Sequence, residues 1–255
     1  KSGAIMLQPD EGIQACGEIG VGRLMSVADI VTAVSSTFHS GVLKGQKVVI
    51  TAGPTREAID PVRYISNHSS GKQGYAIAEA AVEAGANVEL ITGPTSLAPP
   101  QRVRICSVES AEDMFNEVQA TIEDADIFIG VAAVADYRPK LSSKNKIKKE
   151  GDDGLTLEMV QNPDILKFVA EREGKPFTVG FAAETDSLIE HAKKKLQKKK
   201  LDMIIANNVA DPNIGFNSDN NQTIVLTPTT KHELPMMSKT ELARKLIDLI
   251  ANEIG

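Results

Sequence analysis

Three segments carry side chains that could hold a phosphate group. The first places Ser69 and Ser70 directly before Gly71 and Gly74, at the start of a predicted helix. Hydroxyls and free backbone N–H groups then meet at a helix N-terminus, where the helix dipole stabilises an anion. The same residues also suit an ordinary capped helix that packs closely on a sheet, so the pattern alone leaves both interpretations open.

Lysines gather in the second segment, a hydrophilic loop over 133–154, and in a predicted helix over 186–200. The loop lysines are Lys144, Lys146, Lys148 and Lys149. Such a loop could close over a triphosphate and meet the charge that develops on departing pyrophosphate. In the helix, Lys195 and Lys199 are four residues apart and share one face, where they could clamp phosphates. The alternative in both places is a solvated charged surface.

Small residues follow the predicted strand at 126–132. Gly130, Val131 and Ala132 would let a flat ligand approach the backbone, whose N–H and C=O groups can read the edge of a base. Asp136 could accept a hydrogen bond from a ribose hydroxyl or a base amine. Together these residues could accommodate a nucleotide.

The elements that must position these residues alternate between strands and helices. The predicted strands span 47–52, 87–91, 103–107, 126–132, 155–160, 178–182 and 203–206, with a hairpin at 222–226 and 231–234. The predicted helices span 71–84, 111–122, a segment that opens at Pro163, 186–200 and 239–253. This alternation predicts a Rossmann-like α/β fold, an open, mostly parallel sheet with helices on both faces. Ligands bind such sheets beyond the carboxyl ends of the strands, which selects the loops 53–70, 133–154, 181–186 and the turn after Ala206.

The first 44 residues differ from the rest. Residues 1–24 are rich in glycine and show no periodic element, whereas 26–38 has helical spacing with Ser26 as its cap. Residues 41–45 are interpreted as a linker. We therefore predict a tail over 1–44 and one domain over 45–255.

Composition excludes several classes of protein. The net charge of −6 argues against bulk attraction to nucleic acid. The apolar run 127–135 is half the length needed to suggest a membrane span, no secretory signal is recognised, and a cytoplasmic protein is expected. Cys16 and Cys106 form no disulfide framework or zinc motif, and His68 and His191 lack neighbours at ligand spacing, so no protein-bound structural metal is expected.

Three functions remain open on residue patterns. A dehydrogenase using NAD(P) normally has GxGxxG after the first strand and an acidic residue after the second. Here these positions read Gly53 to Arg56 and Leu90 to Pro94, which contain neither feature. An NAD(P)-dependent reductase is thus demoted, whereas an enzyme that uses a nucleotide in another reaction and a noncatalytic nucleotide-binding module both stay open.

Seven motifs in order resemble the bacterial phosphopantothenoylcysteine synthetase family. They are TAGPTRE (51–57), RYISNHSSGK (63–72), AAVADYR (132–138), KIKK (146–149), NPDI (162–165), GFAAET (180–185) and GFNSDNN (215–221). The resemblance runs from about Gly45 to the C-terminus. It implies a ligase that attacks CTP with the carboxylate of 4′-phosphopantothenate, with Mg²⁺ as cofactor, and then transfers the acyl group from CMP to L-cysteine.

The resemblance also implies roles for single residues. Asn67 matches the asparagine that holds the acyl-cytidylate, and Lys146 matches the flap lysine needed for turnover. The positions that match CTP contacts are Gly130, Val131, Ala132, Asp136, Lys146, Pro163, Asp164, Ile165, Leu166, Phe181, Lys195 and Lys199. The family implies a homodimer, and we expect its interface near the hairpin at 222–234.

The tail carries a second resemblance. Residues 9–10, 14–20 and 22–23 are similar to the terminal substrate flap of phosphopantothenoylcysteine decarboxylase, which is fused ahead of the synthetase in bacteria. Cys16 would match the catalytic cysteine of that enzyme and is expected to be idle here. FMN is expected only in the decarboxylase domain, which would be a partner within a longer chain.

Overall fold

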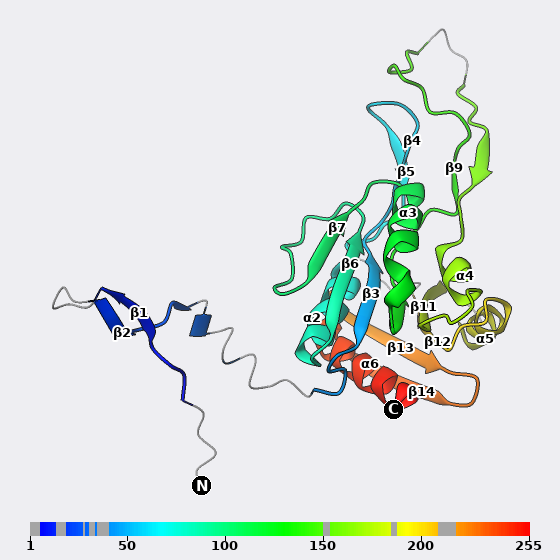
Figure 1. Cartoon of the computed structure of the whole chain (residues 1–255). Coiled ribbons are helices and arrows are strands. Elements are labelled where there is room, and N and C mark those ends of the chain that lie inside the picture. Colours follow the sequence, from blue (N-terminus) through cyan, green and yellow to red (C-terminus); the bar gives the residue numbers. More distant parts are fainter. Residues whose placement is uncertain are drawn as a thin grey trace.

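The fold centres on one large sheet (Figure 1). The computed structural model describes residues 6–13, 19–27, 29–30, 34, 41–149, 154–184, 188–208 and 218–255. Within these ranges, eight strands form the sheet in the order β14-β13-β12-β11-β8-β3-β6-β7. They are β3 (Lys47–Ala52), β6 (Asn87–Thr92), β7 (Arg104–Ser107), β8 (Ile127–Gly130), β11 (Phe177–Glu184), β12 (Met203–Asn208), β13 (Asn220–Leu226) and β14 (Lys231–Ser238).

The sheet is mostly parallel, as predicted. The strands from β12 to β7 in this order pair in parallel, and only β13 and β14 join as antiparallel edge strands. The chain moves outward from β3 to β6 and β7, then returns to β8 on the other side of β3. A ligand crevice is expected at this switch point, beyond the carboxyl ends of β3 and β8.

Helices cover both faces because side chains of a strand alternate in direction. Val48 and Ile50 of β3 belong to the core under α2 (Lys72–Glu83) and α6 (Lys239–Ile254). Val49 of the same strand belongs to the core under α3 (Ala111–Thr121) and α4 (Ile165–Ala170). The 3-10 helix η1 (Ile122–Asp124) extends α3, and α5 (Leu188–Lys198) packs on β12. The predicted fold class is confirmed.

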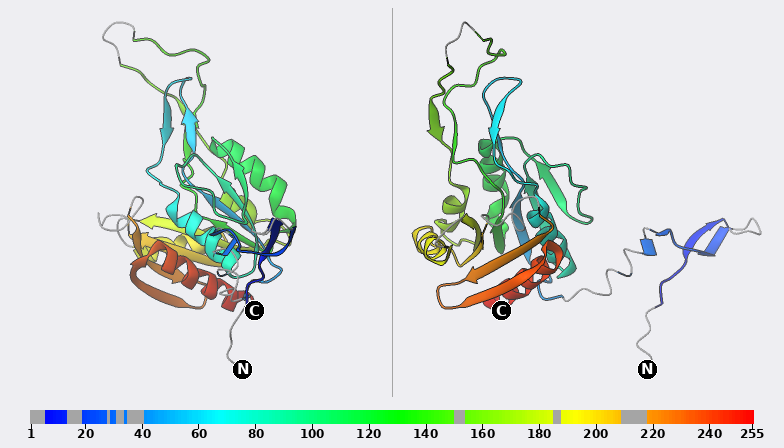
Figure 2. Two further views of the ribbon diagram at one scale, coloured as in Figure 1. Left: turned by 90° about the vertical axis from the view of Figure 1, so that its left-hand side faces the viewer. Right: turned by 180° about the vertical axis from the view of Figure 1, so that it is seen from behind.

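Two loops of the sequence prediction contain short strands instead. Within 53–70, β4 (Arg56–Ala58) and β5 (Tyr64–Ser66) form an antiparallel hairpin. Beyond β8, β9 (Tyr137–Pro139) pairs with β10 (Met159–Gln161). β10 replaces the strand predicted at 155–160 and begins four residues later. Strands of three residues are too short to show a period of two in the sequence. Figure 2 shows both pairs projecting side by side beyond the sheet.

The N-terminal residues contain a feature that the sequence analysis missed. β1 (Asp10–Ile13) and β2 (Ile19–Arg23) form an antiparallel pair, so the prediction of no regular element in 1–24 was wrong. Cys16 and most of the predicted helix at 26–38 lie outside the described residues. The N–H of Asp29 donates to Ser26 Oγ at 3.1 Å, which fits the predicted cap. In the predicted linker, Leu43 is fully buried.

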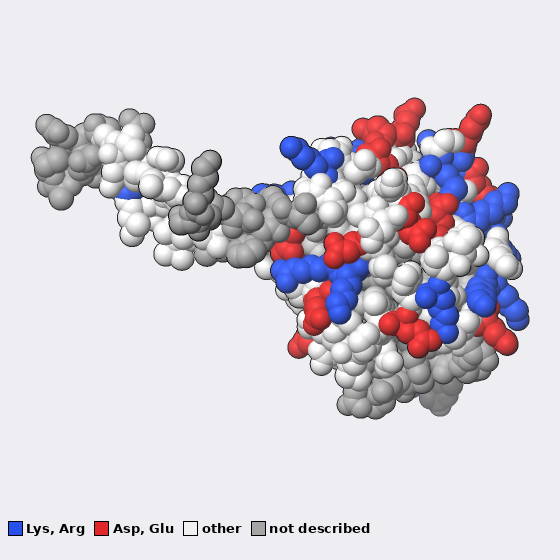
Figure 3. Space-filling view, turned by 90° about the horizontal axis from the view of Figure 1, so that it is seen from below, with Lys and Arg blue, Asp and Glu red and all other residues white. Residues whose placement is uncertain are grey.

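The face that Figure 3 displays carries charges of both signs. Basic and acidic side chains are interspersed there, and no broad patch of one sign is visible. A search of the described residues for a helix with the length and apolarity to cross a membrane gives none.

Candidate functional site

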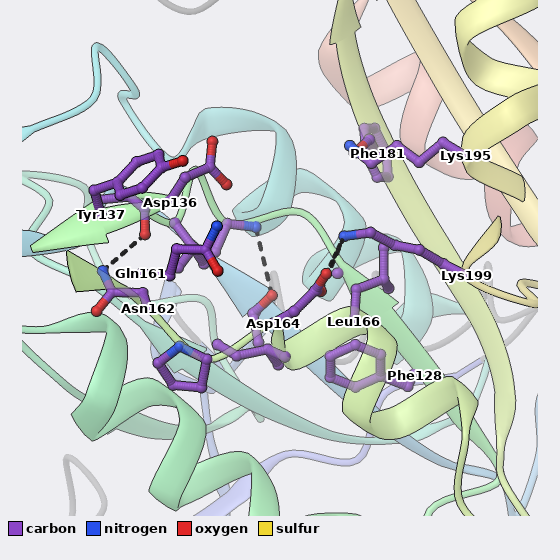
Figure 4. Close-up of a pocket in the computed structure, with 17 residues that line it drawn as sticks. Phe128, Asp136, Tyr137, Gln161, Asn162, Asp164, Leu166, Phe181, Lys195 and Lys199 are labelled. Atoms are coloured by element: carbon purple, nitrogen blue, oxygen red, sulfur yellow. Dashed lines mark hydrogen bonds and ion pairs between the residues drawn. The ribbon is translucent and has the colours of Figure 1, made fainter.

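A first cavity of about 390 Å³ lies beyond the carboxyl ends of β8 and β11. Ten of the predicted nucleotide contacts line it: Gly130, Ala132, Asp136, Pro163, Asp164, Ile165, Leu166, Phe181, Lys195 and Lys199. These residues come from four separate stretches of the chain, and Figure 4 labels six of them, which lie around the pocket. The structure therefore brings together most of the residues that the sequence predicted as one site.

The first wall of this cavity is the start of α4. Asp164 is the N-cap of this helix, and its Oδ1 accepts a hydrogen bond from the N–H of Lys167 at 3.0 Å. Lys199 Nζ lies 2.7 Å from Asp164 Oδ2. Burial by itself would raise the pKa of Asp164, but the hydrogen bonds from Lys199 and Lys167 outweigh it and hold this pKa below its ordinary value. Asp164 is therefore a carboxylate that neutralises Lys199.

The second wall is formed by β11 and α5. Lys195 Nζ donates to the carbonyl oxygen of Phe181 at 3.4 Å, at the long limit of a hydrogen bond. Lys195 and Lys199 lie on the same side of α5, as their spacing predicts, and both reach the cavity. The pair can supply positive charge to a bound anion.

The segment after β8 is held against the end of β3 by its own backbone. Val131 N–H donates to Thr51 O at 3.1 Å, and Ala133 N–H donates to Gly53 O at 2.9 Å. Ala135 N–H donates to Thr55 Oγ1 at 3.0 Å. These three donors therefore hold the loop in place, and the expectation that backbone N–H and C=O groups at 130–132 read the edge of a base stays a prediction.

A second cavity of about 350 Å³ adjoins the first. The two cavities share Ala132, Val134, Asp136, Phe181 and Lys195 as lining residues. The second is also lined by Val131, by Asn67 and by the start of α2 at Ser69, Ser70 and Gly71. Asn67 Nδ2 donates to Ala133 O at 3.0 Å, so its side chain is oriented at the wall of the second cavity.

The start of α2 is built by glycine rather than by a serine cap. Gly71 is the N-cap at φ 78°, a left-handed conformation that glycine adopts without strain, and no side chain caps the helix. A Cβ on Gly74 would lie 2.5 Å from Ala52 Cβ. The glycines thus bring the N-terminus of α2 close to the end of β3, where it faces the second cavity.

Lysines that the sequence analysis did not select line the second cavity. Lys239, the first residue of α6, is 7% exposed, and Lys72 Nζ lies 2.6 Å from Asp219 Oδ1. Burial, together with the charge of Lys72, lowers the pKa of Lys239 to about 8. A lysine at the start of a helix gives no sequence signal that it will be buried, so only the fold reveals it.

The side chains that fix the rim of the first cavity were also missed. Asn162 Nδ2 donates to Ala135 O at 2.8 Å, and Asn162 N–H donates to Asp136 O at 2.9 Å. Arg138 Nη1 donates to Asn162 Oδ1 at 2.9 Å. Gln161 and Tyr137 complete this rim. The signal available in the sequence was Asn162 before Pro163 and Asp164, a turn that leads into a helix.

Lys146 is the one predicted site residue that lines neither cavity. It is exposed, on the segment that joins β9 to β10. The position of Lys146 relative to the cavities therefore depends on the contacts that hold the segment between β9 and β10.

The structure gives no support to a metal held by the protein alone. Among the described residues, no three His, Cys, Asp or Glu side chains come close enough together to hold an ion. The cavities thus supply lysines, carboxylates, an amide and a helix N-terminus, which suit a phosphate-bearing ligand.

Comparisons with known proteins find one family model and several similar proteins. The model of the DNA/pantothenate metabolism flavoprotein C-terminal domain family matches residues 43–254. The Coenzyme A biosynthesis bifunctional protein CoaBC of Vibrio vulnificus is 48% identical over 249 residues, covering 97% of this chain and 62% of the relative. The chain thus spans about three fifths of the length of the curated relatives that it matches.

Solved structures match as well. The crystal structure of the C-terminal domain of CoaBC has a TM-score of 0.73 and 42% identity, over 84% of this chain and 98% of that one. A complex of a Cab2 mutant with phosphopantothenate-cysteine has a TM-score of 0.67 and 16% identity, over 90% and 95% of the two chains. The second likeness is one of fold alone.

Proposed function

Because the chain belongs to the DNA/pantothenate metabolism flavoprotein C-terminal domain family, we propose that it joins 4′-phosphopantothenate to L-cysteine with CTP, as a coenzyme A biosynthesis ligase. One observation carries the proposal: ten residues selected as CTP contacts line a single cavity, and Asn67 lines the cavity that adjoins it. The products are 4′-phosphopantothenoylcysteine, CMP and pyrophosphate.

The proposed reaction has two steps. A carboxylate oxygen of 4′-phosphopantothenate attacks the α-phosphorus of CTP and pyrophosphate leaves, which gives a 4′-phosphopantothenoyl-CMP. The amine of cysteine then attacks the acyl carbon, CMP leaves, and the amine loses a proton. The carboxylate needs this activation because a mixed anhydride has a far better leaving group than the free acid.

The residues act by positioning and by charge. Lys195 and Lys199 neutralise nucleotide phosphates in the first cavity, and Asn67 orients the acyl-cytidylate from the second cavity. Lys146 supplies a cation to the charge that develops as pyrophosphate departs. No covalent bond to the protein is needed.

Mg²⁺ fits as an ion that arrives with the nucleotide. The donors at the first cavity include Asp136 and Asp164, but no cluster of three ligands forms among the described residues. When bound, Mg²⁺ would neutralise the triphosphate and polarise the attacked phosphorus. The triphosphate oxygens would supply most of its ligands.

The remaining assignments rest on the family. We propose a homodimer in the cytoplasm, with residues 45–255 as the synthetase domain. The tail over 1–44 would belong to a decarboxylase domain that binds FMN in a longer chain. The edge strands β13 and β14 remain the place where we expect the dimer interface.

Pyrophosphate release tests the proposal. It is measured with CTP and, in parallel, ATP, in the presence of Mg²⁺ and 4′-phosphopantothenate, with and without cysteine. Release that requires 4′-phosphopantothenate and favours CTP is expected. No release with either nucleotide would return the noncatalytic nucleotide-binding module to first place.

A further inference from the structure

Asp60 is a fully buried carboxylate at the turn of the β4–β5 hairpin. Its Oδ1 accepts hydrogen bonds from the N–H groups of Val62 and Arg63, at 2.8 and 2.9 Å. Its Oδ2 accepts from the Arg63 guanidinium, with Nε at 3.1 Å. One further donor comes from 87 residues along the chain, because Ile147 N–H donates to the same Oδ2 at 3.1 Å. Asp60 thus joins the hairpin to the lysine loop.

Both backbone groups of Ile147 are held at this point. Arg63 Nη2 donates to Ile147 O at 2.9 Å, while Asp60 accepts from Ile147 N–H. The side chain of Arg63 holds the pKa of Asp60 well below its ordinary value, with further support from the three N–H donors. The carboxylate therefore keeps its charge throughout the pH range of an assay.

A second contact fixes the loop on the other side of Lys146. Ser143 N–H donates to Ile59 O at 2.9 Å, next to Asp60 in the hairpin turn. Ser143 Oγ donates to Asn145 O at 2.6 Å and closes a turn between the two contacts. Lys146 thus sits in a span of a few residues tied down at both ends, and its own side chain is exposed.

We infer that Asp60 is a positioning residue for Lys146, which fixes the place from which the lysine meets the nucleotide. Lys146 lines neither cavity, so its reach depends on the position of its loop. A loop held in advance loses less conformational entropy when the charged complex forms. This inference rests on the proposed function for the role of Lys146, whereas the anchoring of the loop can be measured without it.

The test compares Asp60→Asn and Arg63→Ala with the unaltered chain. Asp60→Asn keeps the shape of the side chain but removes its charge. Arg63→Ala removes the donor to Ile147 O and also the guanidinium that pairs with Asp60. The control is Asp124→Asn, since Asp124 is an exposed carboxylate paired with Lys47. Amide hydrogen exchange at Ile147 reports the anchor, and the kcat and KM of CTP-dependent pyrophosphate release report its effect.

In Asp60→Asn we expect exchange at Ile147 to rise, with no change at β3, and kcat to fall roughly tenfold at an unchanged KM for CTP. Arg63→Ala should likewise raise exchange at Ile147 and lower kcat. Asp124→Asn should match the wild type in both measurements. An unchanged exchange rate at Ile147, faster exchange throughout the domain, or an unchanged or higher kcat would overturn the inference. If the wild type releases no pyrophosphate, the proposed function fails and exchange at Ile147 alone decides whether Asp60 anchors the loop.

Discussion

Lys199 Nζ lies 2.7 Å from Asp164 Oδ2, which links the residue after α5 to the N-cap of α4 at the wall of the first cavity. Without a ligand, the carboxylate neutralises the lysine. A bound phosphate would compete with Asp164 for the ammonium group of Lys199. The carboxylate of Asp164 would then repel the phosphate unless Lys199 stayed between the two. Under the proposed function, Lys199 would therefore act both as a phosphate ligand and as a screen for Asp164.

Lys199→Gln should raise the KM for CTP roughly tenfold or more, because a charge-assisted hydrogen bond is lost and Asp164 is left facing the phosphates. The melting temperature should change little, since a partly exposed ion pair contributes little to stability. Lys198→Gln is the matched control, because its side chain is exposed one position away on α5. Equal KM values for the two variants would remove Lys199 from the nucleotide site.

Lys146→Gln should lower kcat roughly a hundredfold, because a cation that meets the departing pyrophosphate is worth most in the transition state. CTP affinity, measured by calorimetry, should stay near that of the wild type, since the lysine lines neither cavity. Lys148→Gln changes another exposed lysine of the same loop and should retain full turnover. A wild-type kcat in Lys146→Gln would exclude this role.

Gly74→Ala should destabilise the domain by about 1–3 kcal/mol, because the new Cβ would lie 2.5 Å from Ala52 Cβ and force α2 away from β3. Urea unfolding measures this change. Gly154→Ala is the control, since a Cβ there meets no atom within 4 Å. If Gly74→Ala unfolds at the same urea concentration as the control, the contact between α2 and β3 can accept a methyl group at position 74 without loss of stability.

The sheet could be predicted because its core strands are long and uniformly apolar. The run from Val48 to Ile50 indicates a strand buried on both faces, and its alternation with helices led to the correct fold class. The carboxyl-edge rule then selected 133–154 and 181–186, which contribute residues to the first cavity, and 53–70, which contributes residues to the second. For the named residues of that cavity, the resemblance to a family supplied what spacing alone left open.

Contacts between segments far apart in the sequence could not be predicted. Asp60 and Ile147 meet only because the β4–β5 hairpin and the lysine loop project together, and strands of three residues give no periodic signal. Asn162 likewise fixes the Asp136 segment through contacts that its neighbours in sequence do not suggest. Local patterns specify elements, whereas the partners of polar side chains depend on the finished packing.

Lys239 should make anion binding depend on pH near 8. Its pKa is lowered to about 8 by burial and by Lys72, so the side chain that lines the second cavity is charged below this pH and neutral above it. The affinity for inorganic pyrophosphate should therefore fall as the pH rises from 7 to 9.5. Lys239→Gln should bind more weakly at pH 7 and lose this part of the pH dependence, whereas Lys245→Gln, an exposed position on the same helix, should keep it.

The stability of the unliganded domain should change in the opposite direction over the same range. The unfolded chain holds the proton of this lysine up to an ordinary pKa of about 10.4, while the folded chain releases it near 8. Between these values the unfolded state binds more protons, so the contribution of Lys239 to the free energy of unfolding rises with pH. Urea unfolding of the wild type and Lys239→Gln at pH 7 and pH 9.5 measures that contribution. A difference between the two proteins that does not change with pH would show that Lys239 titrates normally, and the predicted pH dependence of pyrophosphate binding would then lose its cause.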